Sequence, residues 1–235
     1  MAWKCSYCKL LPLGNFGIEI NFYNLCIKRK QIMYIIGVAG GSGSGKTTFV
    51  HRLFQRLPKE GIAILPQDAY YKDSLHLSPE ERKLQNFDHP DSIEWNLMLD
   101  HIKQLRSGQA IECPTYDYIS CLRLKETIHI EPCKLLLIEG ILLYTCKKLC
   151  KEIDMKIFRD VPADYRLSRI IERDMQSRAR TAQDVIDRFY QTVRPMHEEF
   201  IEPSKLRADV LLSGAEVDDK AVDFIAGGII KILEE

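Results

Sequence analysis

Four short apolar runs along the chain predict the strands of a sheet. They are residues 33–38 (MYIIGV), 61–65 (GIAIL), 135–138 (LLLI) and 155–159 (MKIFR). Runs without regular polar alternation are typical of parallel strands that helices cover on both faces. We therefore expect an α/β domain of three layers with a mostly parallel central sheet.

Longer stretches between these runs carry the 3.6-residue apolar rhythm of helices. One helix is expected to begin at Asp91 or Ser92, run to about Arg106 and end at Gly108. Its apolar side is formed by Ile93, Leu97, Leu99, Ile102 and Leu105. Another helical stretch follows Pro162, a residue type that often opens a helix.

Two segments between these helices, residues 112–121 and 124–132, alternate in polarity and predict a hairpin. The hairpin carries Tyr116 and Tyr118. Exposed tyrosines at such a place can stack on a nucleobase, although packing into a core is the more common role of a tyrosine.

The length of 235 residues suits one α/β domain, and we assign residues 33–235 to it. Residues 1–32 differ from the rest, because they are rich in aromatic residues and cysteine and lack the clean apolar run of a secretory signal. We expect them to be a disordered extension or the product of a mis-assigned start.

Composition narrows the class of partner. The 33 basic and 33 acidic side chains cancel, so no overall field favours nucleic acid or anionic lipid. No segment reaches the roughly 18 to 20 uninterrupted apolar residues of a membrane span. Among the eight cysteines only Cys5 and Cys8 form a C-x-x-C pair, and no second pair or nearby histidine completes a zinc site with them. The cysteines are therefore expected to be free thiols in a reducing cytoplasm.

A phosphate-binding loop follows the first predicted strand. Residues 40–47 fit the pattern G-x-x-x-x-G-K-S/T, and an amphipathic helix follows, which is the context that this motif requires. In such a loop, backbone N–H groups surround the phosphates, Lys46 reaches the β- and γ-phosphates and the Thr47 hydroxyl binds Mg²⁺. The predicted ATP-binding residues of the loop are Gly40, Gly41, Ser42, Gly43, Ser44, Gly45, Lys46, Thr47 and Thr48.

Two of the other runs end in acids, at the edge where a parallel sheet binds its ligand. Asp68 follows the strand of residues 61–65, and Glu139 ends the run of residues 135–138. A kinase needs one carboxylate to accept or orient the proton of the attacking hydroxyl and another for the metal. Asp68 suits the first role and Glu139 the second, although an acid at a strand end is also a common cap or turn residue.

Five arginines crowd about fifteen positions of the helical stretch after Pro162. They are Arg166, Arg169, Arg173, Arg178 and Arg180. By composition alone, a solvated face with i,i+4 ion pairs is the simpler interpretation. The alternative is a lid whose arginines contact the transferring phosphoryl group, and the break at Ser177, Ala179 and Thr181 favours it.

Seven segments together resemble the uridine–cytidine kinase family, within the wider phosphoribulokinase and uridine kinase group. They occur in the family's order and spacing over residues 34–212, as GVAGGSGSGKTT, PQDAYY, NFDHPDS, PTYDYIS, LLLIEGILL, RDMQSRAR and TVRPMHEEFIEPSK. The resemblance implies a P-loop fold similar to that of nucleoside monophosphate kinases, with an acceptor hairpin and a lid. It also implies a homotetramer.

The same resemblance implies roles for individual residues. Asp68 would be the catalytic base for a nucleoside 5′-hydroxyl, with Lys46 as the second catalytic residue. Arg173 and Arg178 would contact phosphates, and Thr47 and Glu139 would position Mg²⁺. The residues that would contact the nucleoside are Asp88, through the ribose hydroxyls, and Tyr116, Cys121 and Arg180.

The chain departs from the family pattern mainly at the nucleoside. Cys121 stands where the family usually has a histidine, Ile170 where it has an arginine, and Arg188 where it has a glutamine. The usual P-R-G after the last strand is replaced by Ser213 and Gly214. Polar groups that read a buried base edge contribute to selectivity, so these changes affect base specificity rather than catalysis.

The sequence therefore predicts ATP-dependent, Mg²⁺-dependent phosphorylation of uridine or cytidine to the monophosphate. One alternative is a kinase of the same superfamily that acts on another small alcohol, such as an altered nucleoside or a sugar phosphate. A second alternative is a nucleotide-binding regulator that no longer transfers phosphate, against which Lys46, Thr47, Asp68 and Glu139 argue.

Overall fold

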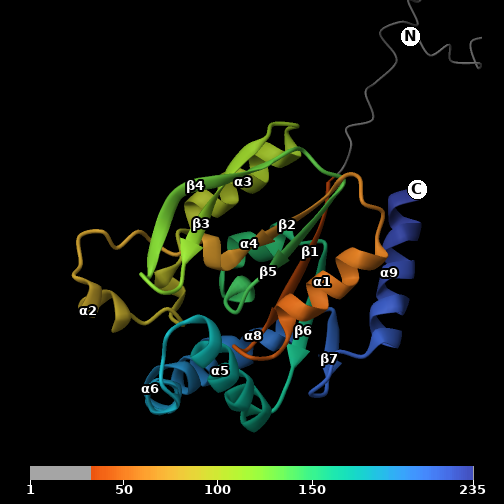
Figure 1. Ribbon diagram of the computed structural model, residues 1–235. Coiled ribbons are helices and arrows are strands. Elements are labelled where there is room, and N and C mark those ends of the chain that lie inside the picture. The colour runs from red at the N-terminus through yellow and green to blue at the C-terminus, as the bar shows by residue number, and fades with distance from the viewer. Residues whose placement is uncertain (1–32, 235) are drawn as a thin grey trace, which may run out of the picture. The chain divides into compact units, whose positions relative to one another are not determined.

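The computed structural model describes residues 33–234, so the prediction for residues 1–32 lies outside the described part of the chain. Five parallel strands form the central sheet in the order β2-β5-β1-β6-β7. They are β1 (Tyr34–Gly40), β2 (Ile62–Pro66), β5 (Leu135–Glu139), β6 (Met155–Asp160) and β7 (Val210–Ser213). The four apolar runs are thus confirmed as strands of a parallel sheet, and β1 lies at its centre (Figure 1).

Helices cover both faces of this sheet, which confirms the three-layer α/β architecture. Alternate residues of β1 point to opposite faces, so Ile36 and Val38 pack in one core and Ile35 in the other. The first core is covered by α1 (Lys46–Arg56) and α9 (Asp219–Glu234), which lie to the right of the sheet in Figure 1.

The second core lies under α3 (Trp95–Arg106), α4 (Lys147–Glu152) and the predicted hairpin. The hairpin is formed by β3 (Ile111–Asp117) and β4 (Leu122–Ile130), an antiparallel pair with an irregularity between Pro114 and Tyr116. Figure 1 shows it as a long ribbon across the upper left of the domain.

The predicted start of the α3 helix at Asp91 or Ser92 was wrong. Residues Pro90–Ser92 form a 3₁₀ turn, and the α-helix begins only at Trp95. The reason is tertiary, because Ile93 is extended and bridges to Tyr71 while the Glu94 N–H donates to the Tyr70 carbonyl. These long-range bonds replace the first helical turn.

The arginine-rich stretch forms two helices, α5 (Ala163–Ser177) and α6 (Ala182–Arg188), separated at the predicted break. The chain leaves the helical region after Ser177, and Ala179 has a φ of 51°. Two π-helical turns follow and alternate with α7 (Arg194–Met196) and α8 (Glu202–Ser204). A short helix α2 (Pro79–Lys83), with Ser78 as its N-cap, lies at the left edge of the view in Figure 1.

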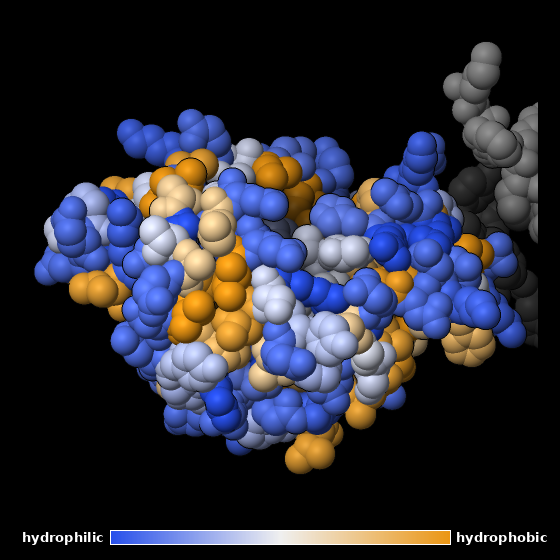
Figure 2. All heavy atoms as spheres, turned by 60° about the horizontal axis from the view of Figure 1, so that its bottom comes forward, coloured by the Kyte–Doolittle hydropathy of each residue, from blue (hydrophilic) through white to orange (hydrophobic). Residues whose placement is uncertain are grey.

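Within the described residues, no helix is both long enough and apolar enough to cross a bilayer. On the face that Figure 2 presents, apolar side chains reach the surface as a strip enclosed by hydrophilic ones.

Candidate functional site

The phosphate loop connects β1 to α1 and depends on its glycines. Gly43 and Gly45 have φ of 76° and 79°, a region that favours glycine. A Cβ at Gly43 would lie 2.5 Å from the Arg166 carbonyl oxygen, so helix α5 also excludes a side chain there. No side chain of the described chain caps the start of α1. Its first N–H groups and the positive end of its dipole are therefore free for an anion.

Lys46 opens α1 and is 8% exposed. Its ammonium group donates a hydrogen bond to the Gly41 carbonyl at 3.0 Å. Burial lowers the pKa of Lys46 to about 8, although the nearby carboxylates of Glu139 and Asp68 oppose that shift. An anionic ligand would stabilise the charged form of such a buried ammonium group.

Thr47 and Glu139 form a pair of oxygen-bearing side chains close to this lysine. The Thr47 hydroxyl lies 3.0 and 2.9 Å from the two carboxylate oxygens of Glu139. Burial raises the pKa of Glu139, and the charge of Lys46 opposes that shift. Hydroxyl and carboxylate oxygens fit Mg²⁺. No cluster of three or more acidic, histidine or cysteine side chains suited to a metal occurs among the described residues.

The two strand-end acids are held together by packing beneath them. Strands β2 and β5 are neighbours, with Pro66 opposite Glu139. Gln67 is fully buried, and its side-chain oxygen accepts the Leu142 N–H at 2.9 Å. A Cβ at Gly140 would lie 2.3 Å from that same oxygen, so glycine is required there. Asp68 follows Gln67 directly and therefore has a fixed place relative to Glu139.

Asp88 lies in the segment before α3 and is 5% exposed. Burial raises the pKa of Asp88, and the Arg188 guanidinium, whose Nη2 lies 3.8 Å from Asp88 Oδ2, opposes that shift. Arg188 also lies over the Phe87 ring at 5.5 Å. The sequence departure at Arg188 thus places a cation beside the acid that the family resemblance assigns to the ribose.

The hairpin contributes the side wall of the site. Tyr116 packs against Tyr71, with ring centroids 5.0 Å apart, and its buried hydroxyl has no hydrogen-bond partner among the described residues. Cys121 is buried with a φ of 56°, and its thiol donates to the Tyr118 carbonyl at 3.6 Å. An unpaired phenol and a thiol thus face the region where a nucleobase is expected.

The arginines of the lid converge on one buried acid. Asp174 is 1% exposed and lies 2.8 Å from Arg173, 3.5 Å from Arg178 and 2.9 Å from Arg180. Three guanidinium groups on one carboxylate leave a net positive charge toward the site. The contact between Arg178 and Asp174 is an i,i+4 ion pair, as in the simpler interpretation, but the acid that the three arginines share is buried rather than solvated. Ile170, in contrast, packs with Val185, Phe189 and Val193.

One cavity of about 510 Å³ connects these groups. Its lining includes most of the side chains that the sequence predicts, namely Ser42, Lys46, Thr47, Asp68, Asp88, Tyr116, Cys121, Glu139, Arg173, Arg178 and Arg180. The predicted residues that do not line it are Gly40, Gly41, Gly43, Ser44, Gly45 and Thr48. Four of these are glycines, which offer only backbone. Ser44 is fully buried, and Thr48 is exposed on α1.

Asp174 and Phe87 are among the lining residues that were not predicted from the sequence, whereas Tyr118 was named with Tyr116 as a hairpin tyrosine able to stack on a nucleobase. Phe87 directly precedes Asp88, so its neighbour in the motif is the sequence signal for it. Asp174 follows Arg173 and offers no separate signal.

A phosphate loop on the central strand of a parallel sheet, two acids at neighbouring strand ends and an arginine-bearing lid define a P-loop kinase. A solved D-glycerate 3-kinase from Cryptococcus neoformans var. grubii has the same fold, with a TM-score of 0.56 and 14% identity, covering 74% of this chain and 80% of that one.

The sequence gives the more particular assignment. The Phosphoribulokinase / Uridine kinase family matches residues 35–221, and the chain belongs to this family. It is 43% identical over 204 residues to a uridine kinase from Oceanobacillus iheyensis, covering 87% of this chain and 97% of that one. It is 42% identical over 201 residues to a uridine kinase from Bacillus mycoides, covering 86% and 95%.

Proposed function

We propose that this chain transfers the γ-phosphoryl group of ATP to the 5′-hydroxyl of uridine or cytidine. One observation carries the proposal: Lys46 of the phosphate loop, Asp68, Asp88 and Tyr116 all line a single cavity. Such a set of side chains suits a triphosphate and a nucleoside that are bound together. The relatives named uridine kinase support this acceptor and favour neither the small-alcohol kinase nor the regulator.

Around the phosphate loop, side chains and backbone groups bind the phosphates of ATP and neutralise their negative charge. The loop N–H groups and Lys46 bind the β- and γ-phosphates, and Arg173 and Arg178 approach the transferring group from the lid. Thr47 and Glu139 would hold Mg²⁺, which supplies further neutralisation of phosphate charge when it is bound. The lowered pKa of Lys46 supports this assignment, since phosphates restore the favourable surroundings of its charge.

At the acceptor end, Asp68 takes the proton of the 5′-hydroxyl as that oxygen attacks phosphorus. Asp88 accepts hydrogen bonds from the ribose hydroxyls, and a deoxyribose would leave part of its carboxylate unsatisfied. Tyr116, Cys121 and Arg180 contact the nucleoside. The unpaired Tyr116 hydroxyl supports this role, because a buried phenol needs a partner that the described residues do not provide.

The test is a coupled assay of ADP release with uridine, cytidine, purine nucleosides and small sugars as acceptors. We expect turnover with the two pyrimidine nucleosides. Asp68→Asn should lower kcat by about two to four orders of magnitude with ATP binding retained. Asp73→Asn, an exposed acid on the same connection, serves as the matched control. ADP release that does not depend on any acceptor would refute the proposal.

We further propose that residues 33–235 are the catalytic domain, that residues 1–32 are not needed for activity, and that the enzyme is a cytoplasmic homotetramer. The free cysteines Cys113, Cys121, Cys133, Cys146 and Cys150 support a reducing compartment. Light scattering on the full chain and on a chain that begins at Met33 tests the assembly and the domain boundary together. Loss of turnover in the shorter chain would contradict the boundary.

A further inference from the structure

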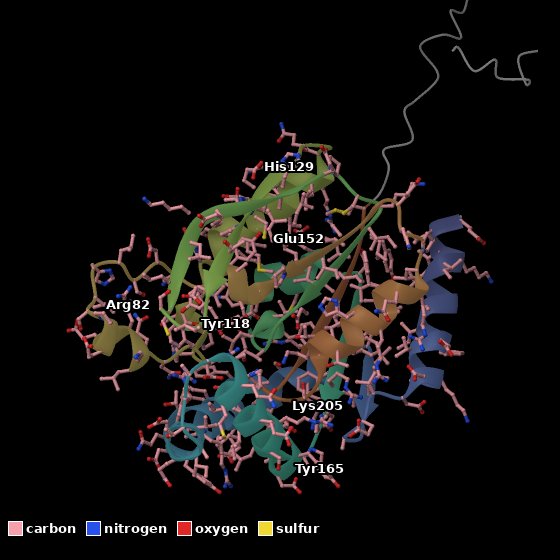
Figure 3. All side chains as sticks on the ribbon, viewed as in Figure 1. Arg82, Tyr118, His129, Glu152, Tyr165 and Lys205 are labelled. Atoms are coloured by element: carbon pink, nitrogen blue, oxygen red, sulfur yellow. The ribbon has the colours of Figure 1, made fainter. Side chains whose placement is uncertain are left out.

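Tyr118 connects the hairpin to the proposed catalytic base. Its hydroxyl donates a hydrogen bond to Asp68 Oδ2 at 2.9 Å. Figure 3 shows Tyr118 at the lower end of the hairpin, where the hairpin approaches the lid. The two residues are 50 positions apart in sequence, so only the folded chain brings them together.

The Tyr118 ring is held on two sides. The ring of Tyr116 meets it edge-on, with centroids 5.5 Å apart and planes at 76°. The guanidinium of Arg178 lies over its face, 4.1 Å from the ring centroid. A cation over an aromatic face is an attractive contact, and here it joins the lid to the hairpin. Tyr118 therefore has a defined orientation although the residue is 36% exposed.

The chemistry of the pair fixes the direction of the hydrogen bond. Burial, and then the negative charge of Asp68, raise the pKa of Tyr118 above its ordinary range, so the phenol keeps its proton and donates. The acceptor is the Asp68 carboxylate, and hydrogen bonds to charged groups are stronger than neutral ones.

One oxygen of Asp68 is thus engaged and the other is not. Within residues 33–234, Oδ1 of Asp68 makes no hydrogen bond, and Asp68 lines the cavity. A carboxylate fixed through Oδ2 presents Oδ1 in a constant direction to an incoming hydroxyl. A fixed base raises the fraction of bound complexes in which the proton acceptor is correctly placed.

We propose that Tyr118 is a positioning residue for phosphoryl transfer, because it holds the Asp68 carboxylate toward the acceptor hydroxyl. This inference rests on the proposed role of Asp68 as the base. Tyr118 itself exchanges no proton with the substrate, and the lid arginine holds its ring in place.

The test is Tyr118→Phe, which removes the hydroxyl and keeps the ring contacts with Tyr116 and Arg178. We expect kcat to fall about ten- to a hundredfold, as for a lost hydrogen bond to a charged group, with an unchanged KM for ATP. Tyr165→Phe removes the same hydroxyl from a 52% exposed tyrosine on α5 and should change neither quantity.

A double-mutant cycle separates this inference from the proposed function. In an Asp68→Asn background, Tyr118→Phe should have little further effect on kcat, because the two groups act as one unit. An equal loss of kcat in both backgrounds would overturn the role of Tyr118. Full activity of Asp68→Asn alone would instead refute the proposed base.

Discussion

Binding of ATP should draw a proton onto the enzyme at alkaline pH, and Lys46 is the reason. The group is nearly buried, and its pKa falls from 10.5 to about 8 in the free protein. Phosphate oxygens around the ammonium group favour its charged form, so binding returns the pKa toward its ordinary range. A return of this size corresponds to about 3 kcal/mol of interaction between Lys46 and the phosphates.

The number of protons taken up follows from the free-state pKa. A lysine with a pKa of about 8 is unprotonated in about three-quarters of molecules at pH 8.5 and in about one-tenth at pH 7. Full protonation in the complex therefore means uptake of about three-quarters of a proton at pH 8.5 and about one-tenth at pH 7. The sign is uptake, because the group is charged more completely when bound than when free.

Calorimetric titration with MgATP, without acceptor and in buffers of different ionisation enthalpy, measures this uptake directly. Lys46→Arg keeps a cation at the site but stays charged at both pH values, so its uptake should be close to zero. Equal uptake at pH 7 and pH 8.5 in the unmodified protein, or proton release at pH 8.5, would refute the reasoning. Uptake that persists in Lys46→Arg would assign the proton to another group.

Two further substitutions test the lid and the base pocket. Asp174→Asn leaves three guanidinium groups without their shared acid and should lower the free energy of unfolding by about 2 kcal/mol, reduced from the fully buried case because Arg173 is partly exposed. Urea denaturation measures this, and unchanged stability would show that the lid arginines do not depend on Asp174. Cys121→His offers a stronger hydrogen-bonding group and should raise the preference for uridine over purine nucleosides. An unchanged ratio of kcat/KM values would show that residue 121 does not face the base.

Much of this fold could be predicted because the sequence signals for its elements lie within the elements themselves. The strand runs are continuous and apolar, the phosphate loop has a fixed spacing, and Gly108 ends a helix as expected. The prediction of where α3 begins failed, because a bridge between Ile93 and Tyr71 overrides the local preference for helix. Such a bridge joins segments more than twenty residues apart and leaves no pattern in either of them.

The site was predictable in its motif residues and not in the contacts among them. Arginine spacing on α5 fits a solvated face as well as a lid, and only the fold shows that Arg166 is 3% exposed against the phosphate loop. The convergence of three arginines on Asp174 and the bond from Tyr118 to Asp68 depend on the directions of side chains. Residue spacing does not determine those directions.

The close approach of Gln67 to Gly140 has a consequence for changing what this enzyme accepts. Because the buried amide fills the space beside Gly140, the segments that carry Asp68 and Glu139 share one rigid support. Any larger residue at position 140 displaces both acids at once, so the distance between Asp68 and Glu139 cannot be changed by moving one acid alone. Redesign toward a different alcohol must therefore leave the strand ends untouched and work through the hairpin and the lid, where each side chain can be exchanged separately.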